Sequence, residues 1–278
     1  VVVTGTCLSG SINAGDELRL HASAGSNTQH IKVRVREIHT QGRPASAGHA
    51  GQRCALNLAG KVSLEQVHRG DFLCAHPTAL PARRLDTRCW TVAGSGRSLK
   101  HLGRVKLYIG TRRMGARTYF LDRGEDSPSG QRVQLILDRG VLACAGDLVV
   151  LRDDNESSTL GGGVVIDPQA PQRGKSRSNR LKQLDALEMG QPGAVLGQLL
   201  FNNGDIVSLR QCKRIWNLSQ EEMNGLLARP PLNAGNLVRI HTDGDELILS
   251  RELWESYVDC LDQQLAEWHG ARPMEPGI

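Results

Sequence analysis

The sequence predicts a mainly β fold, with two small antiparallel β-barrels followed by an α+β part. Over residues 1–170 the chain reads as short strands separated by turns that contain Gly. Beyond residue 182 the spacing of apolar residues becomes helical, and a basic segment that contains Pro separates the two regions. Many short strands with Gly turns and no helical periodicity are typical of small antiparallel barrels.

Residues 1–80 are expected to form the first barrel. The stretch "IKVRVREIH" alternates with period two, which places Ile and Val on one face and the cations on the other. In "AGQRCALNLAG", Cys54, Leu56 and Leu58 alternate with small or polar residues, so this strand also has one packed face. Arg53 opens that strand after a Gly turn. Two interpretations are open: an ordinary surface arginine, or a ligand-binding group, because guanidinium offers five fixed donors and keeps its charge.

Residues 81–170 are expected to form the second barrel, and residues 171–182 a basic linker. The "GGG" at 161–163 is interpreted as a bend between strands. Between residues 97 and 117 there are seven basic side chains and no acidic one. They are an ordinary solvated strand face or a surface that contacts an RNA backbone. These side chains are Arg97, Lys100, Arg104, Lys106, Arg112, Arg113 and Arg117.

Residues 183–278 contain two short helices that break near Asn217, and Ser219 with Glu222 forms a capping-box pattern for the second. A hairpin around Gly244 and a further helix follow. The order helix, helix, hairpin, helix is that of a winged-helix module.

The second helix, which enters DNA in many winged helices, carries Glu221 and Glu222 and only Arg229 near its end. A role as a spacer or a protein contact is therefore favoured over binding of duplex DNA.

Charge divides the chain more sharply than its net value of +5 shows. Residues 1–182 carry a net charge of +12 and residues 183–278 a net charge of −7. A polyanion such as RNA would be attracted to the first part and repelled by the second.

The composition is that of an ordinary soluble globular chain. The sequence shows no apolar run long enough to cross a membrane and no signal peptide. The start inside an apparent strand indicates a fragment of a longer protein. The seven cysteines are widely spread without any C-x-x-C, which favours free thiols in a reducing cytoplasm over zinc or disulfides.

No catalytic machinery or metal-ligand spacing is recognisable in the sequence. The "RGKS" at 173–176 resembles the end of a phosphate-binding loop, but Gln169 stands where that motif needs Gly. The nine His residues are scattered. We therefore predict no catalytic and no metal-binding residues.

Several motifs together resemble translation factors. "VVVTGTCLSGSINAGDELRL", "AGQRCALNLAG" and "RGDFL" fit any translational GTPase of the elongation factor Tu type. Arginine after Ala-Gly-Gln, the ending "LGGGVVIDP" and a winged helix after two barrels resemble the selenocysteine-specific elongation factors of bacteria (SelB).

The resemblance covers essentially the whole chain. It implies domains II and III of the factor, the first winged helix and the start of a second. The GTPase domain and the first strand of domain II would precede Val1, and the terminal mRNA-binding winged helix would lie beyond Ile278.

The resemblance also implies a function. The parent protein would use GTP and magnesium to deliver selenocysteinyl-tRNA to the ribosome at recoded UGA codons in the cytoplasm. It would bind the selenocysteine-insertion hairpin of the mRNA through the absent terminal domain. Whether the chain itself counts as an enzyme stays open, because GTP hydrolysis would belong to the absent GTPase domain.

In the aminoacyl pocket of this family, the position of Arg53 is implied to read the selenol, and Thr4 matches a pocket-lining threonine. His39 is expected near the pocket, with a partly buried structural histidine as the favoured alternative. The basic strands of the second barrel would contact the tRNA backbone.

Three other functions are alternatives to this one. Another elongation factor Tu-like GTPase stays open, and a winged-helix DNA-binding regulator is less favoured. A metabolic enzyme with barrel domains would need a catalytic cluster that the sequence does not show.

Overall fold

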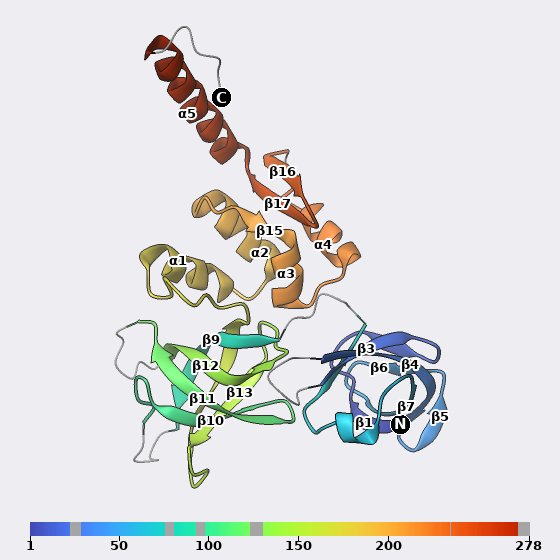
Figure 1. Ribbon diagram of the computed structural model, residues 1–278. Coiled ribbons are helices and arrows are strands. Elements are labelled where there is room, and N and C mark those ends of the chain that lie inside the picture. Colours follow the sequence, from blue (N-terminus) through green and yellow to red (C-terminus); the bar gives the residue numbers. More distant parts are fainter. Residues whose placement is uncertain (23–28, 76–80, 93–97, 123–129, 234, 272–278) are drawn as a thin grey trace. The chain divides into compact units, whose positions relative to one another are not determined.

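The computed structural model describes residues 1–22, 29–75, 81–92, 98–122, 130–233 and 235–271 (Figure 1). The chain divides into two compact units. The first comprises Val1–Ala143 with Asp147–Ala170, and the second comprises Cys144–Gly146 with Pro171–Ile278.

The first half of unit 1 is an antiparallel sheet with the order β1-β7-β4-β3-β8, in which β5 also pairs with β4. A separate ribbon of β2 and β6 and a short 3₁₀ turn, η1, complete it. Its core is made by the inward side chains of the three longest strands, including Leu18, Val33, Ile38 and Leu56. The elements are β1 (Val2–Thr6), β2 (Ser11–Asn13), β3 (Glu17–Ala22), β4 (Gln29–Thr40), β5 (Arg43–Ala45), β6 (Ala47–His49), β7 (Arg53–Ala59), η1 (Leu64–Gln66) and β8 (Phe72–Cys74).

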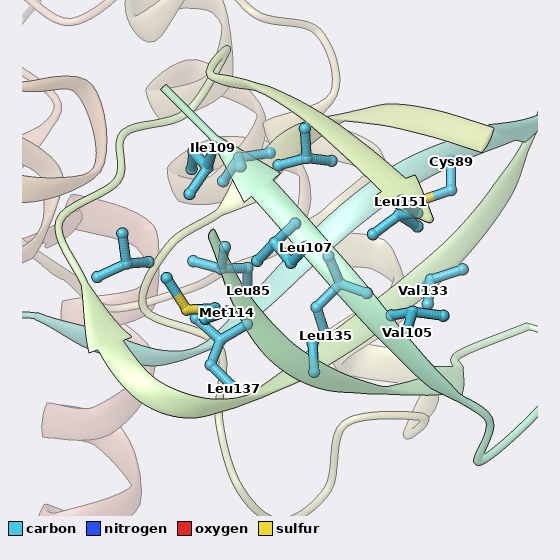
Figure 2. Close-up of a cluster of buried hydrophobic side chains, with 14 of the residues drawn as sticks. Leu85, Cys89, Val105, Leu107, Ile109, Met114, Val133, Leu135, Leu137 and Leu151 are labelled. Carbon is cyan, nitrogen blue, oxygen red and sulfur yellow. The ribbon is translucent and has the colours of Figure 1, made fainter. Parts of the chain in front are cut away.

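The second half of unit 1 is a closed six-stranded barrel with the order β10-β11-β12-β9-β14-β13. Figure 2 shows its core, where Leu85, Leu107, Leu135 and Leu151 are fully buried. The strands are β9 (Ala82–Thr91), β10 (Arg104–Ile109), β11 (Arg112–Phe120), β12 (Gln131–Val141), β13 (Leu148–Asp153) and β14 (Thr159–Asp167).

The three glycines at 161–163 lie inside β14, so their interpretation as a bend between strands is wrong. A Cβ atom at Gly161 would collide with the backbone of Trp90, and one at Gly163 with that of Arg88. Glycine is required here because β9 approaches β14 too closely for a side chain.

A buried contact joins the two halves of unit 1. Arg112, the first residue of β11, is 8% exposed, and its Nη1 donates to the carbonyl oxygen of Gly70 at 3.1 Å. The same nitrogen lies 3.6 Å from Oδ1 of Asp71, whose side chain is also buried. Phe72, which follows, packs against the core of the closed barrel. The turn before β8 is therefore anchored to the second barrel.

The part of unit 2 from α3 on has the predicted order of two helices, a hairpin and a further helix, and the helices α1 and α2 that precede it were not predicted. Asn217 adopts a left-handed conformation (φ 52°) that ends α3, and Ser219 and Glu222 form the predicted capping box of α4. The hairpin turns at Asp243-Gly244, as predicted. The elements are α1 (Ser178–Leu187), α2 (Pro192–Gly197), the π-helical turn η2 (Gln198–Asn202), β15 (Val207–Ser208), α3 (Leu209–Trp216), α4 (Gln220–Leu227), β16 (Leu237–Thr242), β17 (Asp245–Ser250) and α5 (Arg251–Ala271).

Helix α1 begins at Ser178, inside the segment 171–182 that the sequence predicts as a linker. The irregular stretch after the barrel is therefore shorter than predicted. None of the seven cysteines, all of which lie in the described ranges, takes part in a disulfide. None of the helices in the described ranges is both long and apolar enough to span a membrane.

The substitution Arg112→Ala is expected to lower the free energy of unfolding by about 3 kcal/mol, because it removes the cation that faces the buried Asp71 carboxylate. Urea denaturation followed by circular dichroism measures this loss. Arg113→Ala is the matched control, since that neighbouring side chain points to solvent and its loss is expected to change stability little. Equal losses in the two variants would show that the buried contact does not stabilise the protein.

Candidate nucleic-acid interface

The turn before β7 fixes the position of Arg53. Gly51, with φ 86°, donates its N–H to the carbonyl oxygen of Cys7, and Cys7 donates in return to Gln52. The Gln52 side chain accepts from the N–H of His49 at 2.8 Å. Arg53 therefore begins β7 from a backbone that is bonded on both sides, and its own side chain is exposed.

Arg53 and Thr4 lie on the same outer face of the sheet, and Nη2 of Arg53 lies 3.5 Å from Oγ1 of Thr4. The strand register aligns Thr4 with Ala55 on β7, and Ala55 in turn with His39 on β4. Side chains of aligned residues in antiparallel strands share a face. The structure thus brings together all three residues that the sequence predicts for the aminoacyl pocket.

His39 is exposed, so the alternative of a partly buried structural histidine is wrong. A β-bulge between Val35 and Glu37 is the reason. One extra residue in β4 reverses the alternation. After the bulge Ile38 points into the core at 2% exposure, whereas Glu37 and His39 point outward.

Glu37 is a member of this face that sequence reasoning missed. It aligns with Asn57 on β7, and Nδ2 of Asn57 donates to its Oε2 at 3.4 Å. The signal was available in "REIH", where an isolated Ile follows two charged residues and breaks the alternation. The face we call the Arg53 face therefore consists of Thr4, Glu37, His39, Arg53 and Asn57.

The Arg53 face offers complementary groups to a ligand. The guanidinium of Arg53 can hold an anion with several donors, and the carboxylate of Glu37 can accept from a hydroxyl or an ammonium group. The threonine hydroxyl and the imidazole can donate or accept. An aminoacyl ester of a ribose carries partners for each of these groups.

The outer surface of the closed barrel carries most of the predicted basic side chains. Burial alternates along β10 and β11, so that Arg104 and Lys106 of β10 and Arg113 and Arg117 of β11 point outward. Arg104 and Arg117 are aligned in the register. Lys100 is exposed in the preceding loop, and Arg97 lies outside the described residues.

Arg112 does not belong to this surface, because its side chain points inward and is buried against the turn before β8. A strand reverses the direction of successive side chains, so Arg112 and Arg113 cannot share a face. The prediction that Arg112 contacts an RNA backbone is therefore wrong.

Carboxylates from other strands meet three of the outward cations. Asp154, after β13, lies 3.3 Å from Nζ of Lys106 and 3.9 Å from Nε of Arg104. Asp138 of β12 lies 3.5 Å from Nη2 of Arg104. Although no acidic residue lies between positions 97 and 117 in the sequence, carboxylates from other parts of the chain lie beside these cations in the structure.

Gly115 of β11 makes the contact of Asp138 possible. Asp138 and Arg104 belong to strands on either side of β11, and Gly115 is paired with Lys106. A Cβ atom at position 115 would collide with the carboxylate of Asp138. Without that atom, the carboxylate reaches over β11 to the guanidinium of Arg104.

Glu156 is the third carboxylate, at the turn between β13 and β14. Its Oε2 accepts from the hydroxyl of Tyr108 at 2.5 Å and from Nη1 of Arg113 at 3.1 Å. The hydrogen bond from Tyr108, together with the charge of Arg113, lowers the pKa of the Glu156 carboxyl against a partial opposing effect of desolvation. Glu156 is therefore held as an anion beside this cation.

No group of three or more His, Cys, Asp or Glu side chains in the described part of the chain could hold a metal ion.

Comparison with known families places both halves of unit 1. Residues 1–74 match the family model of elongation factor Tu domain 2, up to the end of β8. Residues 86–172 match the model of the β-barrel domain of selenocysteine-specific elongation factors. The two sheets are thus consecutive barrels of a translation elongation factor.

Curated relatives narrow the class. The selenocysteine-specific elongation factor of Escherichia coli (strain K12) is 32% identical over 230 residues, which are 83% of this chain and 34% of that protein. The one of Desulfomicrobium baculatum is 26% identical over 281 residues, covering 100% of this chain and 42% of that protein. The chain belongs to the selenocysteine-specific elongation factors, and it spans well under half the length of these relatives.

A crystal structure of a bacterial selenocysteine-specific elongation factor, EF-Sec, has the same fold. It aligns with a TM-score of 0.69 at 18% identity, over 98% of this chain and 40% of that one. The predicted fold class, two barrels followed by a helix-containing part, is confirmed.

The substitution Tyr108→Phe is expected to raise the pKa of Glu156 toward its ordinary value, because it removes the hydrogen bond that contributes most to the lowering. A group with a lowered pKa stabilises the fold when ionised, and this contribution is lost as pH falls through the folded-state pKa. The measurement is an NMR pH titration of the side-chain carboxyl carbons. Glu222 is an internal control, since its pKa is lowered by hydrogen bonds with Ser219 and is expected to stay unchanged. An unchanged titration of Glu156 would contradict the assignment.

Proposed function

We propose that this chain is the tRNA-binding part of a translation elongation factor that delivers selenocysteinyl-tRNA to the ribosome at recoded UGA codons. The observation that carries the proposal is the Arg53 face, where an exposed permanent cation stands beside Thr4 and His39. Membership of the selenocysteine-specific elongation factors supports it.

Arg53 is proposed to distinguish selenocysteine from serine on the same tRNA. The selenol is ionised at neutral pH, whereas the serine hydroxyl is neutral. A guanidinium therefore attracts the first side chain by charge as well as by hydrogen bonds. When the 3′-terminal nucleotide of the tRNA shields this charge-assisted contact from water, the contact favours the selenocysteinyl ester over the seryl ester by about 1.5–3 kcal/mol.

The 3′-terminal ribose and the α-amino group would lie beside Arg53. Glu37 is the acceptor available for them. Its Oε2 accepts from Asn57, and its Oε1 does not take part in that hydrogen bond. His39, on the same face, is proposed to line the pocket.

The outer surface of the closed barrel is proposed to contact the tRNA backbone. Lys100 and Arg117 are exposed, and no carboxylate in the described ranges pairs with them. Arg104, Lys106 and Arg113 are outward-facing and paired with carboxylates at the surface. Phosphate contacts of this kind position an RNA without reading its sequence.

We assign the domains as two barrels over 1–80 and 81–170 and a winged helix from residue 183 on, with α5 as the start of a second. The winged helix is proposed to be a spacer, since exposed Glu221 and Glu222 occupy the first turn of α4. Binding of the mRNA hairpin is assigned to a part of the whole protein outside this chain.

GTP and magnesium are likewise assigned to the whole protein and not to these residues. The "RGKS" segment lacks the glycine that a phosphate-binding loop needs at position 169. Because the proposed step takes place on the ribosome, we place the protein in the cytoplasm.

Arg53→Ala in the full-length protein is expected to abolish the preference for the selenocysteinyl ester. The measurement compares how strongly the GTP-bound protein protects selenocysteinyl-tRNA and seryl-tRNA from ester hydrolysis. The wild type is expected to protect the first ester about tenfold or more better, and the variant to protect both alike. Arg69→Ala, an exposed arginine before β8, is the matched control and should keep the preference. A wild type without preference would contradict the proposal.

Removal of the exposed cations Lys100 and Arg117 tests the backbone surface. Lys100→Ala and Arg117→Ala are each expected to weaken binding of charged and uncharged tRNA alike, and to reduce the slope of log Kd against log salt by about one. Arg229→Ala, at the end of α4, is the control and should leave the slope unchanged. A loss confined to the charged tRNA would contradict a pure backbone role.

A further inference from the structure

We propose that the carboxylates of Asp154 and Glu156 compete with RNA phosphates for the cations of β10 and β11, so that stable retention of a tRNA depends on its aminoacyl end. The inference rests on the proposed function and names a specificity determinant for it. It concerns the turn between β13 and β14, which we call the acidic turn (residues 153–158).

The acidic turn reaches the cations from a distant part of the sequence. Oδ1 of Asp154 lies 3.3 Å from Nζ of Lys106, and Oε2 of Glu156 lies 3.1 Å from Nη1 of Arg113. Arg104 lies within 3.9 Å of Asp154. Two carboxylates thus pair with cations that the phosphates of a bound backbone would otherwise contact.

The acidic turn is held in place by its own hydrogen bonds. Oδ1 of Asp153 accepts from the N–H of Ser158 at 2.9 Å, and its Oδ2 accepts from the hydroxyl of Ser157 at 2.5 Å. Glu156 adopts a left-handed backbone conformation (φ 58°), and Tyr108 donates to its carboxylate. The carboxylates are therefore ordered before any ligand arrives, and little entropy opposes their pairing with the cations.

One partner of each ion pair is exposed, Arg113 at 64% and Asp154 at 47%, whereas Glu156 at 24% and Lys106 at 28% are partly covered. Exposed ion pairs are weak, so a phosphate in the right place can displace the carboxylate. Breaking each carboxylate–cation pair nevertheless costs free energy, which reduces the affinity gained from the phosphate contact. The Arg53 face contains no residue of the acidic turn, so a ligand held there does not meet this penalty. A deacylated tRNA has only the backbone contacts, so it loses a larger share of its affinity than an aminoacylated tRNA does.

The first test compares the 278-residue chain with a variant that carries Asp154→Asn and Glu156→Gln. The probe is bulk uncharged tRNA, and Kd is measured by fluorescence anisotropy over a range of salt concentrations. The variant is expected to bind about three- to tenfold more tightly, with a steeper dependence on salt because more cations meet phosphates. Glu65→Gln removes one exposed carboxylate from η1 of the same unit and should change Kd less than about twofold.

A second measurement separates local competition from a general effect of charge. In an Arg113→Ala background, Glu156→Gln should give a much smaller gain, because its ion-pair partner is absent and only the weaker charge effect of Lys106 remains. A gain of the same size in both backgrounds would overturn the proposal. A wild type that binds tRNA as tightly as the double variant would overturn it too, while leaving the RNA surface intact. If neither protein binds tRNA, the proposed RNA surface itself is wrong, and the competition falls with it.

Discussion

Both candidate surfaces depend on the buried contact between Arg112 and the turn before β8. The Arg53 face belongs to the first sheet and the basic surface to the closed barrel, and the two sheets have no strand in common. Arg112 reaches the carbonyl of Gly70 and the carboxylate of Asp71 from the start of β11. For the proposed tRNA ligand, a fixed spacing of the two surfaces would let an aminoacyl contact and a backbone contact act together. A buried ion pair suits this purpose, because its geometry is exacting even where its net stabilisation is small.

Local patterns in the sequence predicted much of the fold. The alternation around Cys54 and Leu56, the capping box of Ser219 and the turn at Gly244 each depend on residues a few positions apart. The predicted order therefore held from α3 to α5, whereas α1, α2 and η2 were not predicted. The family resemblance then brought Thr4, His39 and Arg53 together, which spacing alone could not have done.

The sequence predictions that were wrong or incomplete concern residues whose environment depends on distant parts of the chain. The bulge in β4 moves His39 and Glu37 to the outer face, and it depends on how β4 pairs with β7. The burial of Arg112 depends on a turn 41 residues earlier in the chain. The partners of Arg104 and Lys106 come from beyond β11, so a count of charges between positions 97 and 117 could not find them. Composition shows how many charges a surface has, and only topology shows which of them are compensated.

The glycine at position 115 gives this compensation an unusual dependence. Asp138 crosses over β11 to Arg104 only because no side chain stands between them. An alanine there would add one uncharged methyl group and displace a carboxylate from a guanidinium on the far side of the strand. The electrostatic potential of this face is therefore controlled by steric bulk as well as by the number of its charged residues. A variant protein could change its attraction for polyanions without gaining or losing a single ionisable group.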